Sequence, residues 1–221
     1  MDLIFLGLVH FIMTSEWAEL WRPFLEVSPQ CLLPISETIV KAVLLPHNED
    51  AQAPLVRGLK LFAHFCLDSR LLSDLLSSGD QYPQFDVIFE NLLRHAHLTP
   101  ENQSNPNIRQ NSLLVLCSLA SHASFFDWIL ENDHSPHYII KVTNIAFARL
   151  QDSSIQVSEL AIEFLTRWIT VGCYKQPEHY KKWKDTAIKP QQIGSQLYRM
   201  FEQSNSFATQ VVLTNLVIEL T

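Results

Sequence analysis

Glycine is scarce in this chain, with five residues among 221, and glycine and proline gather at a few points. A β-sandwich or barrel needs turn residues at short, regular intervals, so this scarcity argues against an all-β fold. Hydrophobic residues make up 47% of the sequence, which is enough to bury a large core. The two features together favour helices that are joined by short turns.

Local signatures of catalysis are also missing. The chain has no Gly-x-Ser-x-Gly, no glycine-rich phosphate loop and no His-Glu-x-x-His. The tightest histidine pairs, His95 with His97 and His134 with His137, have no carboxylate or cysteine at the spacing that a zinc site needs. A triad of residues from distant parts of the chain stays open, because such a triad depends only on geometry. We therefore expect a protein that is not an enzyme and that has no metal and no cofactor.

The four cysteines are far apart, and no two of them have the Cys-x-x-Cys spacing. Cys66, Cys117 and Cys173 lie within or at the end of apolar helical runs, where a free thiol behaves as a small hydrophobic group. With Cys31 included, the pattern predicts no disulfide framework and a reducing compartment, the cytoplasm or the nucleus.

The net charge of −7 is a poor match for a phosphate backbone. Nucleic-acid binding is therefore expected only through a local basic patch. The apolar stretch 3–13 is too short to span a bilayer, and the acidic Asp2 precedes it where a signal peptide has basic residues. This stretch predicts a buried first helix and no transmembrane segment.

A pattern of large apolar residues recurs at an offset of 54 residues, from position 59 to 113 and from 76 to 130. The paired positions are Leu59 with Leu113, Phe62 with Leu116, Phe65 with Leu119, Leu71 with Phe125, Leu75 with Ile129 and Leu76 with Leu130. Repeated helical units of this size are typical of solenoids.

Apolar spacing and turn residues predict helices throughout the chain. The predicted ranges are 2–13, 15–26, 35–45, 54–67, 69–77, 84–97, 107–121, 123–131, 137–150, 154–171, 177–185, 191–203 and 206–220. Pro54 is expected at the first position of its helix, where its missing N–H costs nothing.

The helices group into three-helix repeats of a long, a short and a medium helix. We expect a helical cap over 1–53 and repeats over 54–106, 107–153, 154–205 and, in part, 206–221. Broad apolar stripes predict that each helix packs against more than one neighbour.

This organisation resembles the armadillo repeat, within the armadillo/HEAT class, over about residues 54–220. Ile108-Arg109, Ser112-Leu113, Leu116 and Ser118-Leu119-Ala120 fit the third-helix pattern of that family, Val56-Arg57 and Phe62 fit it in part, and Leu213-Thr214-Asn215-Leu216 keeps its asparagine. The resemblance implies an all-α, right-handed α-solenoid. It also implies a groove lined by third helices, in which asparagine side chains hold the backbone of a peptide. The matching groove positions are His64, Ser118 and Asn215, and the groove's ligand could be an extended peptide or a helix.

The segment 174–189 is the most distinctive local feature, because it holds five of the sixteen basic residues together with three aromatic ones. An acidic or phosphate-bearing partner could be bound here by Lys181, Lys182, Trp183 and Lys184. In the alternative interpretation, Trp183 and Tyr180 pack inward and the lysines are merely solvated.

The sequence thus predicts a non-catalytic scaffold or adaptor for a protein or peptide partner. Two alternatives remain open, namely nucleic-acid or anionic-lipid binding through 174–189, and a regulatory helical domain of a larger enzyme complex. The sequence does not indicate an oligomeric state.

Overall fold

The computed structural model describes residues 39–46, 49–77, 85–98, 105–131, 135–173 and 177–185, with isolated positions after 197. Regular structure in these residues is helical, with no strand among them, so the predicted all-α class is confirmed for this part of the chain. The helices predicted over 2–26, most of the predicted cap and Asn215 lie outside the described residues.

The described helices agree closely with the predicted ranges. They are α4 (Glu49–Phe65), α5 (Ser69–Ser77), α6 (Phe85–His97), α7 (Pro106–Leu119), α8 (Ala123–Glu131), α9 (Ser135–Arg149), α10 (Ile155–Arg167), the π-helix η3 (Trp168–Cys173) and α11 (Pro177–Trp183). A short helical stretch over 39–43 precedes them. The ranges of α5 and α8 match the prediction at both ends.

Two helix boundaries differ from the prediction. The helix α4 begins at Glu49, so Pro54 lies inside it and the predicted boundary between cap and repeats falls within one helix. Acidic residues such as Glu49 and Asp50 are favoured in a first helical turn, and this signal outweighs the preference of proline for the first position. The helix predicted over 154–171 changes to π geometry at Trp168. There Gly172 lies so close to Phe126 that an added Cβ would be 2.3 Å from its ring.

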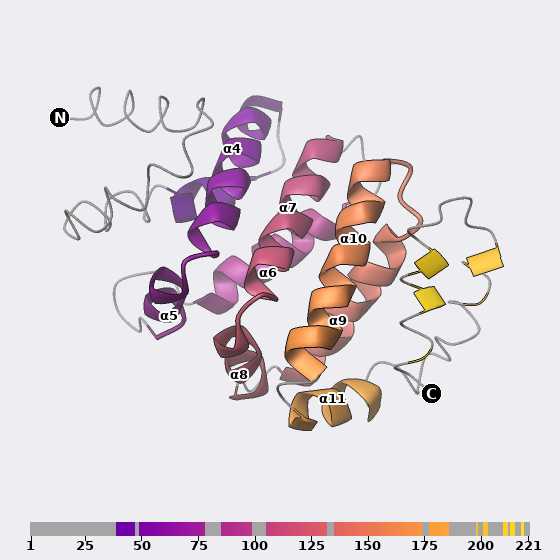
Figure 1. Cartoon of the computed structure of the whole chain (residues 1–221). Coiled ribbons are helices and arrows are strands. Elements are labelled where there is room, and N and C mark those ends of the chain that lie inside the picture. Colours follow the sequence, from indigo (N-terminus) through magenta and orange to yellow (C-terminus); the bar gives the residue numbers. More distant parts are fainter. Residues whose placement is uncertain are drawn as a thin grey trace.

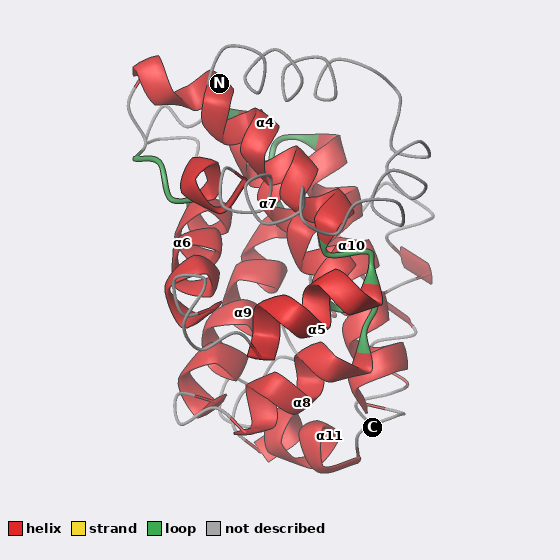
Figure 2. Cartoon of the chain, turned by 90° about the vertical axis from the view of Figure 1, so that its left-hand side faces the viewer, coloured by secondary structure: helices red, strands yellow, loops and turns green. Residues whose placement is uncertain are grey.

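The helices lie in three rows. Figure 1 shows α4, α7 and α10 side by side at the front, α6 and α9 behind them, and α5, α8 and α11 along the lower edge. The central helix α7 packs against α4 on one side, α10 on the other and α6 behind. The turned view in Figure 2 separates the front and rear rows, with α6 to the left of α7 and α9 to the left of α10.

The predicted offset of 54 residues pairs positions of similar burial. Leu59 and Leu113 are both buried, as are Phe62 with Leu116 and Leu75 with Ile129, while Leu76 and Leu130 are both half-buried. In the other two pairs, the earlier residue is half-buried and the later one is buried. The apolar repeat in the sequence therefore follows the core side of two successive groups of helices.

An aromatic cluster joins the rear row to the lower edge. Phe89 of α6 lies edge-on to three rings, with centroid distances of 5.6 Å to Phe125, 5.3 Å to Trp128 and 5.2 Å to Tyr138. Phe85 adds a further edge contact with Trp128 at 4.7 Å. Because edge-to-face ring pairs stabilise beyond their buried area, this cluster fixes α6, α8 and α9 against one another.

The two cysteines whose side chains are described are free and buried, as predicted. Burial raises the pKa of the Cys66 thiol far above its usual range. Burial also raises the pKa of the Cys117 thiol, to about 12, and this thiol donates a hydrogen bond to the carbonyl oxygen of Leu160 at 3.4 Å. Both groups are therefore protonated and inert at neutral pH.

Candidate functional site

The central helix α7 leaves only one narrow stripe open to solvent. Asn107 is exposed and Gln110, Asn111 and Leu114 are half-exposed, at helical spacing along one side, while most of the other residues are buried. Asn105 starts the helix, because its side chain accepts a hydrogen bond from the backbone N–H of Asn107 at 3.0 Å. The stripe is therefore a short row of carboxamides held on a rigid element.

The neighbouring helix α4 exposes a basic stripe. Arg57, Lys60 and His64 lie at spacings of three and four residues, and all three are exposed. Partial desolvation of the imidazole, followed by the positive charge of Lys60, lowers the pKa of His64. His64 is therefore neutral at neutral pH, and the charge of this stripe comes from Arg57 and Lys60.

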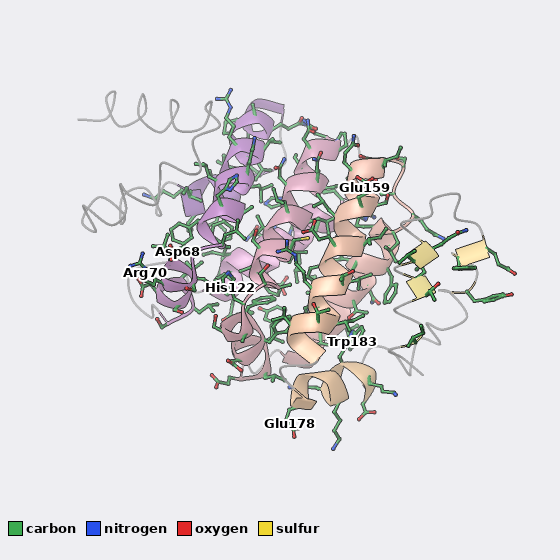
Figure 3. The ribbon with its side chains drawn as sticks, viewed as in Figure 1. Asp68, Arg70, His122, Glu159, Glu178 and Trp183 are labelled. Carbon is green, nitrogen blue, oxygen red and sulfur yellow. The ribbon has the colours of Figure 1, made fainter. Side chains whose placement is uncertain are left out.

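The third helix of the row, α10, exposes an acidic stripe formed by Glu159 and Glu163. Glu159 is labelled on α10 in Figure 3. Glu163 accepts a hydrogen bond from Arg167 at 2.5 Å, one turn further along the helix. Arg167 also donates to the carbonyl oxygen of Cys117 at 3.0 Å and to the hydroxyl of Ser121, which ties α10 to α7.

We call these three stripes together the front face. It consists of Arg57, Lys60 and His64 of α4, Asn107, Gln110 and Asn111 of α7, and Glu159 and Glu163 of α10. Because each stripe lies on a packed helix, the positions of these side chains relative to one another are set by the core behind them.

A buried ionic cluster fixes the spacing of the helices that carry this face. Arg109 of α7 makes a bidentate contact with Asp152 in the turn before α10, with N–O distances of 2.9 and 3.0 Å. Arg149, at the end of α9, donates to Asp152 at 2.8 Å and to the carbonyl oxygen of Leu98 at 2.9 Å. One carboxylate thus joins α7, α9 and the start of α10.

The predicted groove positions have different surroundings. His64 is exposed on the front face, whereas Ser118 is only 3% exposed and its hydroxyl donates to the carbonyl oxygen of Leu114 at 3.1 Å. The Ser118 side chain is therefore occupied within its own helix and does not face a partner. Asn215 is outside the described residues, so the structure does not bring the three positions together.

Sequence reasoning missed the carboxamides of α7. Asn111 lies about two turns before Ser118 on the same side of the helix, and Gln110 precedes it. Their spacing of three and four residues from Asn107 and Leu114 was the available signal. The armadillo-like pattern points to one position per helix, here Ser118. It does not indicate which turns of the helix are exposed, so it did not identify these residues.

The basic segment of α11 is divided between core and surface. Trp183, labelled in Figure 3, is 0% exposed, and its indole N–H donates to the hydroxyl of Thr143 at 2.9 Å. Lys181 is exposed, and Lys182 and Lys184 are half-exposed. The inward packing considered for Trp183 is therefore observed, and this ring cannot stack on a ligand at the surface.

The described residues contain neither a cluster of metal-ligating side chains nor a single helix that could span a membrane. No group of three histidine, cysteine, aspartate or glutamate side chains converges among them. No single helix in the described ranges is long and apolar enough to cross a bilayer, and α7 and α8 reach that length only as a pair bent by 94°.

Comparisons with known proteins assign no family. No protein-family model matches the chain, and no significant match to a curated protein or to a solved structure was found. The function therefore has to be argued from the geometry and chemistry of the front face.

Proposed function

We propose that this protein is a non-catalytic scaffold or adaptor that binds a protein partner on the front face. We further propose that its fold is an armadillo-like, right-handed α-solenoid, with repeats over 54–106, 107–153 and 154–205. The observation that carries the proposal is the row of α4, α7 and α10, which lie side by side and each expose polar side chains over a packed core.

Rigidity is what makes such a face suitable for recognition. A preorganised surface loses little conformational freedom when a partner binds, so a few anchoring contacts are sufficient for affinity. The carboxamides of α7 can donate to and accept from a peptide backbone, which favours a protein ligand over a small molecule. Arg167 and the Arg109–Asp152 pair hold α7 and α10 in register, and this keeps the anchors at constant spacing.

The alternative of nucleic-acid or anionic-lipid binding through 174–189 has less support. Lys181 is exposed and could contact a polyanion, but the indole of Trp183, the one aromatic side chain of this segment that the structure describes, is buried and cannot stack on a base. Binding of that kind weakens steeply between low and physiological salt, which distinguishes it from recognition on the front face.

Affinity capture with a blocked front face tests the proposal. Replacing Asn107 and Gln110 with arginine places two long cationic side chains on the central helix without removing a buried group. We expect the partner captured by the wild type to be reduced at least about tenfold with this variant, because the arginines obstruct the centre of the interface. Quantitative mass spectrometry of the captured proteins measures the loss.

The matched control changes Lys181, Lys182 and Lys184 to glutamate on α11. This variant carries a larger change in charge but leaves the front face intact, so it should capture the same partner as the wild type. Two results would refute the proposed function. One is a partner retained by the blocked face; the other is capture that depends on the three lysines and disappears at physiological salt.

A further inference from the structure

The charges of the front face are segregated by helix. The cations Arg57 and Lys60 lie on α4, uncharged carboxamides lie on α7, and the carboxylates Glu159 and Glu163 lie on α10, where Arg167 pairs with Glu163 and leaves Glu159 uncompensated among the described residues. The sign of the charge therefore changes from positive to negative across the three helices. A surface with separated charges distinguishes between the two orientations of a charged partner, which a uniformly charged surface cannot do.

In the rear row, by contrast, one half-exposed carboxylate is paired between helices. Glu90 of α6 forms an ion pair with Lys141 of α9, and its carboxylate also lies 3.5 Å from Nε2 of His137 on the same helix. On the front face, Arg57, Lys60 and Glu159 have no ion pair with any of the described residues. The uncompensated charges of the front row are thus at its two edges, where an external partner can pair with them.

The carboxamides between these edges keep hydrogen-bonding capacity. The side-chain N–H of Asn111 donates to the carbonyl oxygen of Asn107 at 2.7 Å, which orients the carboxamide along the helix. Its oxygen remains able to accept a hydrogen bond from a peptide N–H. Gln110 makes no side-chain hydrogen bond with the described residues, so it can both donate and accept.

We propose that the front face binds an extended segment of a partner protein whose own charges are segregated. The acidic part of this segment lies over α4, its backbone crosses α7, and its basic part lies over α10. The inference rests on the proposed function and specifies its ligand class. Packed helix axes are about 8–10 Å apart, so α4 and α10 are separated by about 16–20 Å. An extended chain covers that distance with about six residues.

The same charge order disfavours a nucleic acid at this face. A polyanion attracted by Arg57 and Lys60 would meet Glu159 and Glu163 as it crossed to α10. A segment with carboxylates at one end and lysines or arginines at the other meets the opposite charge on both helices. Electrostatic complementarity of this type contributes mainly to specificity and to the rate of association.

Three synthetic peptides of one composition test the inference. Each has about nine residues, enough to span the face, and contains two glutamates, two lysines and a neutral apolar centre. One peptide begins with the glutamates, one begins with the lysines, and the third alternates the charges. Both segregated orders are included because the α7 carboxamides can pair with a main chain that runs in either direction.

Fluorescence anisotropy at low and physiological salt gives the affinities. We expect one of the segregated peptides to bind about tenfold more tightly than the alternating one, because only the segregated order satisfies both charged edges. The double variant Arg57→Glu, Lys60→Glu should abolish this preference. Arg94→Glu on α6 is the matched control, since Arg94 is exposed in the rear row and has no ion pair with the described residues, and it should leave the preference unchanged.

Equal affinity for segregated and alternating peptides would overturn the inference, and so would the absence of measurable binding to any of them. A single-stranded oligonucleotide that bound more tightly than the peptides, and that lost affinity in the Arg57→Glu, Lys60→Glu variant, would also overturn it. These failures differ from failure of the proposed function. If capture still depends on Asn107 and Gln110, the scaffold proposal stands and only the ligand class is wrong.

Discussion

Replacing Asp152 with alanine is expected to lower the free energy of unfolding by about 3–5 kcal/mol. The side chain of Asp152 is 0% exposed and pairs with Arg109 and Arg149, which are themselves almost fully buried. Its removal leaves two guanidinium groups buried without a counter-charge, and such groups are costly to desolvate. Urea unfolding monitored by circular dichroism gives the change.

Asp152→Asn separates the charge of the carboxylate from its shape. This variant keeps one oxygen that can accept hydrogen bonds but loses the negative charge, so we expect a loss smaller than that of Asp152→Ala. Ser153→Ala, at the exposed neighbouring position, should change stability by less than about 0.5 kcal/mol. If Asp152→Ala were no more destabilising than Ser153→Ala, the ionic cluster would not hold these helices together.

The same carboxylate predicts a dependence on pH. Burial alone would raise the pKa of Asp152, but hydrogen bonds from Arg109 and the backbone N–H of Ser154, with the charges of Arg109 and Arg149, hold that pKa below its usual value. Because the unfolded state then binds a proton more readily, Asp152 stabilises the fold above its unfolded pKa of about 4. This contribution should disappear as the pH falls further, through the folded pKa, and it should be missing from the pH profile of Asp152→Asn.

Replacing Phe89 with alanine is expected to lower the free energy of unfolding by about 3–5 kcal/mol. The ring is fully buried and touches Phe125, Trp128 and Tyr138 edge-on, so its removal leaves a cavity and ends three ring contacts. The cavity cannot close easily, because the surrounding rings belong to helices of two different rows. Thermal and urea unfolding measure the effect.

Two further variants in α6 separate cavity formation from a general sensitivity of this helix. Phe89→Leu keeps much of the buried volume, so its cost should be clearly smaller than that of Phe89→Ala. Val87→Ala lies on the same helix but at a position that is 47% exposed, and it should change stability by less than about 0.5 kcal/mol. Similar losses for Phe89→Ala and Val87→Ala would contradict a central role for the aromatic cluster.

Local signals in the sequence were sufficient for most of the helices that the structure describes. The apolar spacing of α5 and α8 gave both of their ends, because flanking turn residues and core contacts indicate the same limits. At α4 a single rule about Pro54 conflicted with the acidic residues before it, and the predicted start was five residues too late. The π-helical segment that follows α10 includes Gly172, which packs closely on Phe126, a long-range contact that no local pattern reveals.

The candidate site was less predictable, since it depends on which side of each helix is covered. His64 is exposed and its predicted role in partner binding stays a prediction, but the family pattern did not show that Ser118 is buried or that Gln110 is half-exposed. The pair Arg109 and Asp152 is 43 residues apart in sequence, so its existence follows only from the packing of α7 against α10. Charge segregation across the front face becomes visible only when the three helices lie side by side.

Photocrosslinking of the captured partner tests the central claim most directly. A photoreactive amino acid at Gln110 places the probe in the middle of the front face, and the same amino acid at Arg94 places it in the rear row. The account predicts a crosslink to the partner from position 110 and none from position 94. A crosslink from position 94 alone would show that the partner binds elsewhere, and it would contradict the assignment of the front face as the interaction surface.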